Sequence, residues 1–448
     1  MSGQTATSVQ SSKNLSQKIV TFTFLLGIFM GALDHGIVGP ALSSIFTSFQ
    51  VDPSWGVWSF TIYTLTFAIS IPILGKLSDR LGRKQTFMTG ITLFAVGSLI
   101  AAFAPSFGGF LLGRAVQAIG AGGIFPITAA QIAATTPPEK RGQAMGWIGV
   151  AFGLGTIMGP AAGGLIISYM NWQWIFLINI PISLIILGLL AGYKQEQDKT
   201  SKPIDVKGII VLSAIILSIM YGITSKTWWM IGLGIVLVPL LVGIERKQAD
   251  PVLNIAYFTR THTRTLLLAS LLSGFVMATS ANFFPYFAEN VLGMMKGNSG
   301  LLVTPFAIAS MIASLVGGKM SDQMGAKKVL VIGFIITLAG AFALAVLVNT
   351  LPLFIATSII MGFGVGIVIG APLNVLILQA VELKETGAAV GYLSLFRSLG
   401  STLGPAVAGI LLSLSTSGFT LLFITSAVLS LCAIGIIVAF VPTNVKKG

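Results

Sequence analysis

The sequence predicts an all-α polytopic membrane protein with fourteen transmembrane helices, in which two homologous six-helix bundles flank two inserted helices. Composition, the spacing of apolar runs and an internal repeat lead to this prediction. The chain of 448 residues is 54% hydrophobic and only 9% charged, and its mean hydropathy is +0.93. Soluble domains carry about 25% charged residues, so this composition argues against a water-soluble fold.

Apolar runs of roughly 20 residues, the length that crosses a hydrocarbon core, define the expected helices. The expected spans are 19–46, 55–75, 86–105, 107–134, 142–169, 174–193, 207–224, 228–244, 265–289, 298–318, 329–348, 351–381, 387–414 and 419–441. With both termini in the cytoplasm, 22 of the 26 Lys and Arg residues fall in cytoplasmic segments or at their helix ends. The net charge of +13 therefore reflects topology and attraction to anionic lipid, and gives no reason to expect a nucleic-acid partner.

The first apolar run is expected to be a retained helix. It is too long for a signal peptide and lacks a small-residue cleavage site, and the polar residues before it are expected to form a cytoplasmic tail. The single cysteine, Cys432, excludes an intrachain disulfide.

Two long motifs recur in the second half of the chain. "GKLSDRLGRK" (75–84) returns as "GKMSDQMGAKK" (318–328), and "GQAMGWIGVAFGLGTIMGPAAGG" (142–164) returns as "GAAVGYLSLFRSLGSTLGPAVAG" (387–409). Parallel repeats around a midplane site are typical of alternating-access transporters. The expected division is a tail (1–18), an N-terminal bundle (19–193), a linker with two inserted helices (194–264), a C-terminal bundle (265–441) and a second tail (442–448).

These motifs resemble those of the major facilitator superfamily, in its fourteen-span drug:proton antiporter branch. "GKLSDRLGRK" is similar to the signature loop between the second and third helices, and "GRAVQAIGAGG" (113–123) to the basic motif of helix 4. "GLGTIMGPAAGG" (153–164) resembles the helix-5 motif of antiporters, and "LDHGIVGPAL" (33–42) the branch's helix-1 motif. The resemblance implies proton-coupled export of lipophilic drugs or similar amphiphiles from the plasma membrane. We expect protons, a small-molecule substrate and membrane lipid as partners, no cofactor, and a functional monomer.

Asp34 is the leading candidate for proton coupling. An aspartate at the middle of a membrane helix costs about 2.5–3.5 kcal/mol, which calls for a partner or a function. Asp34 lies past the middle of an outward-running helix, and Arg114 lies seven residues into an inward-running one. Their similar depth predicts that the two charges meet at the central cavity. The alternative is a structural ion pair without a role in transport.

Three further residues are candidates for a secondary proton site or for substrate contact. His35 titrates in the physiological range, although a neighbour on a helix points about 100° away from Asp34 and often serves packing alone. Glu289 follows a cluster of aromatic side chains near the outer end of its helix, where it could also reach water. Arg397 lies near mid-depth, where it could line the cavity, bond helix-end carbonyls or meet an anionic substrate.

The repeated loop is expected to form a cytoplasmic latch, with topology alone as the alternative. Its residues are Gly75, Asp79, Arg80, Gly82 and Arg83. The glycines permit a tight turn, and Asp79 can accept hydrogen bonds at the N-terminus of a neighbouring helix or pair with an arginine.

The helix-5 motif is expected to act as a hinge and seal between the two halves, in addition to ordinary small-residue packing. The residues assigned to it are Gly155, Gly159, Pro160 and Gly164.

Other classes of function fit the sequence less well. The chain contains no G-x-x-x-x-G-K-[ST] string for ATP, and two histidines with one cysteine disfavour a metal cluster. A membrane-embedded enzyme is the rival from another class, and we expect no enzymatic activity. Within transport, a dedicated exporter of an endogenous lipid, siderophore or metabolite stays open beside drug export.

Overall fold

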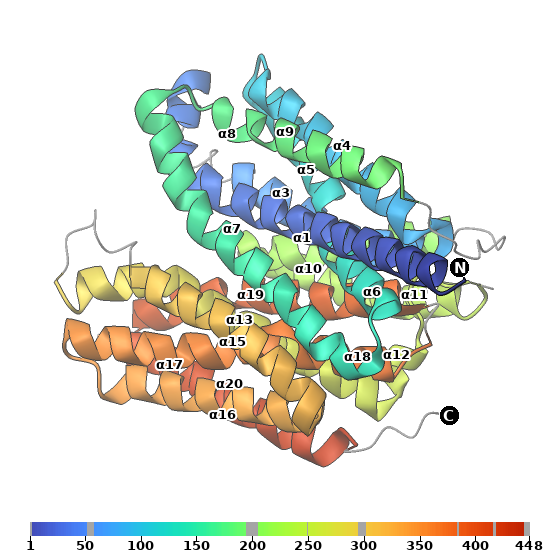
Figure 1. Ribbon diagram of the computed structural model, residues 1–448. Helices are drawn as coiled ribbons and strands as arrows, with labels where there is room; N and C mark the ends of the chain where they lie inside the picture. The colour runs from blue at the N-terminus through green and yellow to red at the C-terminus, as the bar shows by residue number, and fades with distance from the viewer. Residues whose placement is uncertain are drawn as a thin grey trace.

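The computed structural model describes residues 2–51, 58–193, 205–248, 250–293, 302–382, 385–414 and 418–442. Within these ranges the chain is helical without a strand, and 14 segments are long and apolar enough to cross a membrane. The expected class and number of spans are therefore confirmed. The beginning of the first span and the end of the last span lie toward the same end of the molecule (Figure 1), which we call the terminal face.

The N-terminal bundle contains the first six spans. Its helices are α1 (Ser2–Phe49), α3 (Trp58–Leu81), α4 (Arg83–Ala102), α5 (Phe107–Gly122), α6 (Ile124–Thr135), η1 (Pro138–Lys140), α7 (Arg141–Tyr169), α8 (Trp174–Leu177) and α9 (Asn179–Ala191).

The inserted helices and the C-terminal bundle follow. The inserted helices are α10 (Val206–Thr224) and α11 (Trp228–Glu245), followed by the short α12 (Ala256–Thr259). The C-terminal bundle contains α13 (Thr261–Asn290), α15 (Val303–Met324), α16 (Ala326–Val346), α17 (Leu351–Gly370), α18 (Pro372–Gln379), α19 (Thr386–Leu414) and α20 (Gly418–Phe440).

Three expected spans are each divided into two helices, and the span 174–193 breaks at Ile178, between α8 and α9. The span 107–134 breaks at Gly123, between α5 and α6, and the span 351–381 breaks at Ala371, between α17 and α18. Pro372 opens α18, and a proline has no N–H to continue the helical hydrogen bonds. At Gly123 a Cβ atom would lie 2.7 Å from the Leu74 side chain of α3, so close packing accompanies this break.

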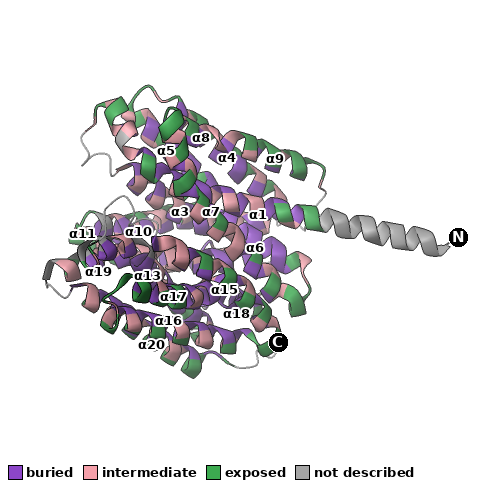
Figure 2. Cartoon of the chain, turned by 60° about the vertical axis from the view of Figure 1, so that its left-hand side comes forward, coloured by how far each residue is buried: buried purple, intermediate pink, exposed green. Residues whose placement is uncertain are grey.

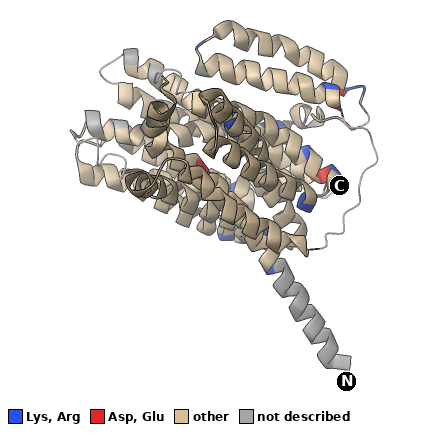
Figure 3. Cartoon of the chain, turned by 90° about the horizontal axis from the view of Figure 1, so that it is seen from above, with Lys and Arg blue, Asp and Glu red and all other residues tan. Residues whose placement is uncertain are grey.

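Large apolar side chains face outward from the bundles, as expected for a surface in contact with lipid. Leu184, Ile235 and Val236 are 63%, 60% and 71% exposed, and exposed residues line the outer helix faces in Figure 2. The charged residues, by contrast, are concentrated toward the terminal face (Figure 3). This separation matches the requirement that apolar surface meets lipid and charge meets water.

The two bundles meet through α3 with α19 and through α7 with α15. The inserted helix α10 packs against both α3 and α19, so it covers the seam between the bundles. Its contact is apolar and involves Leu65 and Ile71 of α3, Ile216 of α10 and Leu395 of α19.

Candidate functional site

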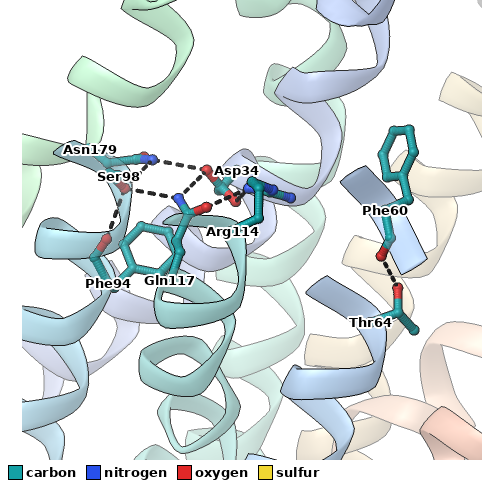
Figure 4. A network of polar contacts seen from close by, with 8 residues as sticks. All are labelled: Asp34, Phe60, Thr64, Phe94, Ser98, Arg114, Gln117 and Asn179. Carbon is teal, nitrogen blue, oxygen red and sulfur yellow. Dashed lines mark hydrogen bonds and ion pairs between the residues drawn. The ribbon is translucent and has the colours of Figure 1, made fainter. Parts of the chain in front are cut away.

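Asp34 is completely buried in α1 and receives hydrogen bonds on both carboxylate oxygens (Figure 4). Arg114 of α5 donates through Nη1 to Oδ2 at 3.0 Å. Gln117 Nε2 and Asn179 Nδ2 donate to Oδ1 at 2.8 and 2.9 Å. The cost of burying this charge is thus offset by one ion pair and two neutral donors, which stabilise the ionised carboxylate.

Ser98 of α4 holds the two amide side chains in place. Its Oγ accepts from Gln117 at 2.8 Å and from Asn179 at 3.3 Å, and donates to the Phe94 carbonyl at 2.8 Å. Arg114 and Gln117 are three residues apart, so α5 presents both on one face, and Arg114 Nη1 also donates to Gln117 Oε1. Four helices therefore supply one continuous polar network.

Aromatic rings cover the guanidinium of Arg114. Its Cζ atom lies 4.2 Å from the ring centre of Tyr63 and 5.5 Å from that of Phe176, within the range of cation–π attraction. Tyr63 belongs to α3, the helix that packs on α19 of the other bundle. The ion pair is therefore linked through a single aromatic ring to a helix at the seam.

The structure brings Asp34 and Arg114 together, as their depth predicted. The network lies among α1, α4, α5 and α9, all within the N-terminal bundle. Sequence reasoning missed Gln117, Asn179 and Ser98. The sequence could have indicated Gln117, because it lies one turn after Arg114 in the helix-4 motif. It could also have indicated Asn179, because this polar residue interrupts an apolar run.

Neither His35 nor Arg397 is hydrogen-bonded to this network in the described part of the chain. His35 is exposed, and its ring centre is 6.2 Å from that of Tyr63, the ring that covers Arg114. Arg397 of α19 is partly buried, with its Cζ atom 5.3 Å from the ring centre of Phe125 in α6. The side chain of Glu289 lies outside the described residues. A role in transport for these three stays a prediction.

Asp79 of the repeated loop joins the two bundles at the terminal face. Its carboxylate accepts hydrogen bonds from the backbone N–H groups of Gly387 at 2.9 Å and Ala388 at 2.8 Å, in the first turn of α19. The N-terminus of a helix carries free N–H groups and a partial positive charge, which favour a carboxylate there. A Cβ atom on Gly75 would lie 2.6 Å from the Gly387 carbonyl oxygen, so glycine permits this approach.

The repeat produces a second contact of the same kind. Asp322, at the end of α15, accepts from the N–H groups of Gly142 at 2.6 Å and Gln143 at 2.8 Å, in the first turn of α7. A Cβ atom on Gly142 would lie only 2.3 Å from the carbonyl oxygen of Gly318. We call these two contacts the paired latch.

The other latch residues have separate partners. Gly82 adopts φ of 106°, a conformation that favours glycine, and forms the turn between α3 and α4. Arg83 Nη2 donates to Thr386 Oγ1 at 3.2 Å. Arg80 Nη1 lies 3.8 Å from Asp250 Oδ2, whereas Lys76 Nζ lies 2.6 Å from Asp250 Oδ1. The segment after the inserted helices is thereby tied to α3.

The same connecting segment is also tied to α19. Tyr257 Oη donates to Glu385 Oε2 at 2.9 Å. Burial and then the adjacent Glu385 carboxylate raise the pKa of Tyr257 well above its usual range, so its hydroxyl remains a donor. The connection thus contacts both helices of one seam at the terminal face.

The expected hinge residues do not seal the two bundles. A Cβ atom on Gly155 would lie 2.6 Å from Phe29 O, and one on Gly159 2.8 Å from Leu33 O, so both face α1 of their own bundle. Pro160 also packs against α1, at Gly36. A Cβ atom on Gly164 would have no neighbour within 4 Å among the described atoms.

The seal is formed closer to the terminal face, where α7 meets α15. A Cβ atom on Gly146 would lie 2.7 Å from Ser314 O, and Ser314 Oγ donates to Gly146 O at 3.1 Å. The N-terminal part of the long helix α7 packs against α15 of the other bundle, whereas its C-terminal part packs against α1 of its own bundle.

The family model described as Major Facilitator Superfamily matches residues 24–238 and 266–448. The chain is 38% identical over 411 residues to "Uncharacterized MFS-type transporter YfiU" of Bacillus subtilis, covering 88% of this chain and 79% of that protein. It is 31% identical over 428 residues to "Multidrug resistance protein 3" of Bacillus subtilis, covering 92% and 82%. The fold also resembles the crystal structure of the human organic anion transporter MFSD10 (TETRAN), with a TM-score of 0.74, 16% identity and coverage of 94% and 99%.

Proposed function

Because the chain belongs to the major facilitator superfamily, we propose that it exports lipophilic or amphiphilic small molecules in exchange for protons, by alternating access. It is a multi-pass membrane transporter and not an enzyme. A relative named as a multidrug resistance protein, 31% identical, supports a drug-like substrate. In this proposal the transporter acts as a monomer in the plasma membrane, with the terminal face in the cytoplasm.

The observation that carries the proposal is the fully buried carboxylate of Asp34, 3.0 Å from Arg114 within a spanning segment. Ionisable groups at this depth are expensive and mark proton pathways in pumps and transporters. Arg114 and the two amide side chains all donate hydrogen bonds to Asp34 in this conformation. Proton uptake therefore requires that the carboxylate be released from some of these donors, and proton loss restores them.

Tyr63 provides the link between this step and the movement of the bundles. Its ring covers Arg114, and its helix, α3, packs on α19 of the opposite bundle. Separation of α3 from α19 shifts Tyr63 and changes access to the ion pair. The paired latch holds the terminal face closed in the present conformation. In the proposed cycle this state takes its proton from the opposite side, and opening of the latch lets the proton reach the cytoplasm.

The test is substrate-dependent proton flux into liposomes that contain the purified protein and a pH-sensitive dye. Wild type is compared with Asp34→Asn, which removes the titratable group and keeps the size of the side chain. Glu139→Gln is the matched control, because Glu139 is an exposed carboxylate at the terminal face. Lipophilic cations and amphiphilic anions are both supplied as substrates.

We expect flux in wild type and in Glu139→Gln, and its loss in Asp34→Asn. Undiminished substrate-dependent flux in Asp34→Asn would show that Asp34 does not couple protons to transport. Absence of flux in wild type with every compound would argue against drug export and favour a dedicated exporter.

A further inference from the structure

Arg397 differs from the other deeply placed arginine in having no hydrogen-bond partner among the described residues. The Nε and Nη2 atoms of Arg397 are inaccessible to solvent and donate to no acceptor among the described residues. Arg114, in contrast, is bound to a carboxylate and an amide oxygen. Buried N–H groups of a cation without an acceptor are costly, because they have lost water and gained no counter-charge.

The contact with Phe125 satisfies only part of the guanidinium. The ring centre lies 5.3 Å from Cζ, so the ring attracts the cation through its π system. The N–H groups of a guanidinium point outward along a rigid planar fork, and a carboxylate matches two of them at once. Phe125 offers no such acceptor, so the strongest interaction available to Arg397 is unused.

A second unused donor lies on the same face of α19. Ser394 precedes Arg397 by three residues, so the two side chains are neighbours on the helix surface. Its Oγ is also buried without a hydrogen-bond partner in the described part of the chain. A cationic fork and a hydroxyl, both unpaired, provide donors for one anionic group.

The position of these donors is fixed by the packing of α19. A Cβ atom on Gly274 of α13 would lie 2.0 Å from the carbonyl oxygen of Arg397, so the two backbones touch there. Ser270 of α13 also donates to Leu393 O at 2.7 Å. Phe125, in contrast, belongs to α6 of the opposite bundle. Separation of the bundles removes the aromatic ring and leaves the donors in place.

We propose that Arg397 and Ser394 form a binding subsite for the anionic group of an amphiphilic substrate, such as a carboxylate, and that Phe125 contacts the apolar part of the substrate once the bundles close again. This inference rests on the proposed function in that it names the chemical class of the exported substrate. The anion supplies the counter-charge that Arg397 lacks, and it enters when the bundles separate.

Equilibrium binding to the full-length protein in lipid nanodiscs tests the proposal. The probes are dansyl-labelled undecanoate and the corresponding primary amide, which differ in charge and share the apolar body. The variants are Arg397→Gln, Arg397→Lys and Ser394→Ala. Lys226→Gln is the control, since Lys226 is an exposed cation between the inserted helices.

We expect wild type and Lys226→Gln to bind the carboxylate about tenfold more tightly than the amide. Arg397→Gln should bind both probes equally, Arg397→Lys should keep part of the preference, and Ser394→Ala should weaken carboxylate binding alone. Equal binding of the two probes by wild type, or an unchanged preference in Arg397→Gln, would overturn the subsite. If Arg397→Gln does not fold, the same decision is made from Ser394→Ala and Arg397→Lys.

The outcome is separable from that of the proposed function. Asp34→Asn should lose proton flux and keep the preference for the carboxylate. Wild type that binds the carboxylate through Arg397 but moves no protons would remove proton coupling and leave the subsite intact.

Discussion

Asp79 and Asp322 have equivalent roles in the two halves of the molecule, because each accepts two backbone hydrogen bonds from the first turn of a helix in the opposite bundle. Asp79 binds Gly387 and Ala388 of α19, and Asp322 binds Gly142 and Gln143 of α7. The internal repeat therefore produces a symmetric closure of the terminal face. Each carboxylate gains from the positive end of a helix as well as from two charge-assisted hydrogen bonds.

Removal of either latch charge should favour opening of the terminal face. Hydrogen bonds to a charged group contribute about 1.5–3 kcal/mol, so Asp322→Asn should shift the equilibrium between closed and open states by about tenfold or more. Distances between spin labels at Glu139 and Met324, in a Cys432→Ser background, measure the separation of η1 from the end of α15.

The double variant Asp79→Asn/Asp322→Asn should open further than either single variant. Spin-label distances that stay unchanged in the double variant would show that the carboxylates do not hold the bundles together.

A methyl group at Gly142, where α7 lies against α15, should destabilise the protein and slow transport. The Cβ atom of Gly142→Ala would meet the Gly318 carbonyl oxygen at 2.3 Å, so the helices must separate. We expect a lower thermal unfolding temperature and slower transport. Gly164→Ala in the same helix is the matched control, because no described atom lies within 4 Å of its Cβ position.

The control should be as stable as wild type or more stable, since alanine is favoured over glycine in helices by roughly 0.5–1 kcal/mol. Equal unfolding temperatures for Gly142→Ala and wild type would contradict the tight approach.

Loss of an amide donor should slow proton-coupled transport. Asn179 donates to Asp34 Oδ1 at 2.9 Å. Asn179→Leu removes this donor and leaves the buried carboxylate with one hydrogen bond fewer. Hydrogen bonds to a charged group contribute about 1.5–3 kcal/mol, so substrate-dependent proton flux should fall by about tenfold or more.

Ser183→Ala is the control for Asn179→Leu, because Ser183 lies on the same helix and contacts Met30 instead of Asp34. Proton flux in Asn179→Leu equal to that of wild type would refute the donor role.

Glu245 and Asp205, at the ends of the inserted helices, should stabilise the protein most when one carries a proton. A Cβ atom on Gly208 would lie 2.2 Å from Asp205 Oδ2 and 2.6 Å from Glu245 Oε1, so the two carboxyl groups share one small space. Both residues are buried, and two carboxylates that close cannot both ionise cheaply. Glu245→Gln supplies a permanent donor and should keep or raise the unfolding temperature at pH 8.

Glu245→Ala should lower the unfolding temperature, because it leaves Asp205 and the Leu253 N–H, which donates to Glu245 Oε1 at 3.1 Å, without this partner. Unfolding temperatures in the reverse order would contradict a shared proton.

The sequence by itself determined the fourteen spans, the repeat of Gly75–Lys84 at Gly318–Lys328, and the matching depth of Asp34 and Arg114. These features depend on hydropathy and on distance along a helix axis. Both can be taken from the sequence, because the thickness of the bilayer sets the length of each spanning helix. The tertiary structure alone decided that Asp34 faces the interior of its own bundle, that Gly155 packs on α1, and that Arg397 Nε and Nη2 lack an acceptor among the described residues. The partner of a side chain depends on how each helix is rotated about its axis and on which helix it packs against. The sequence of an apolar membrane helix contains little information about its rotation or its neighbours.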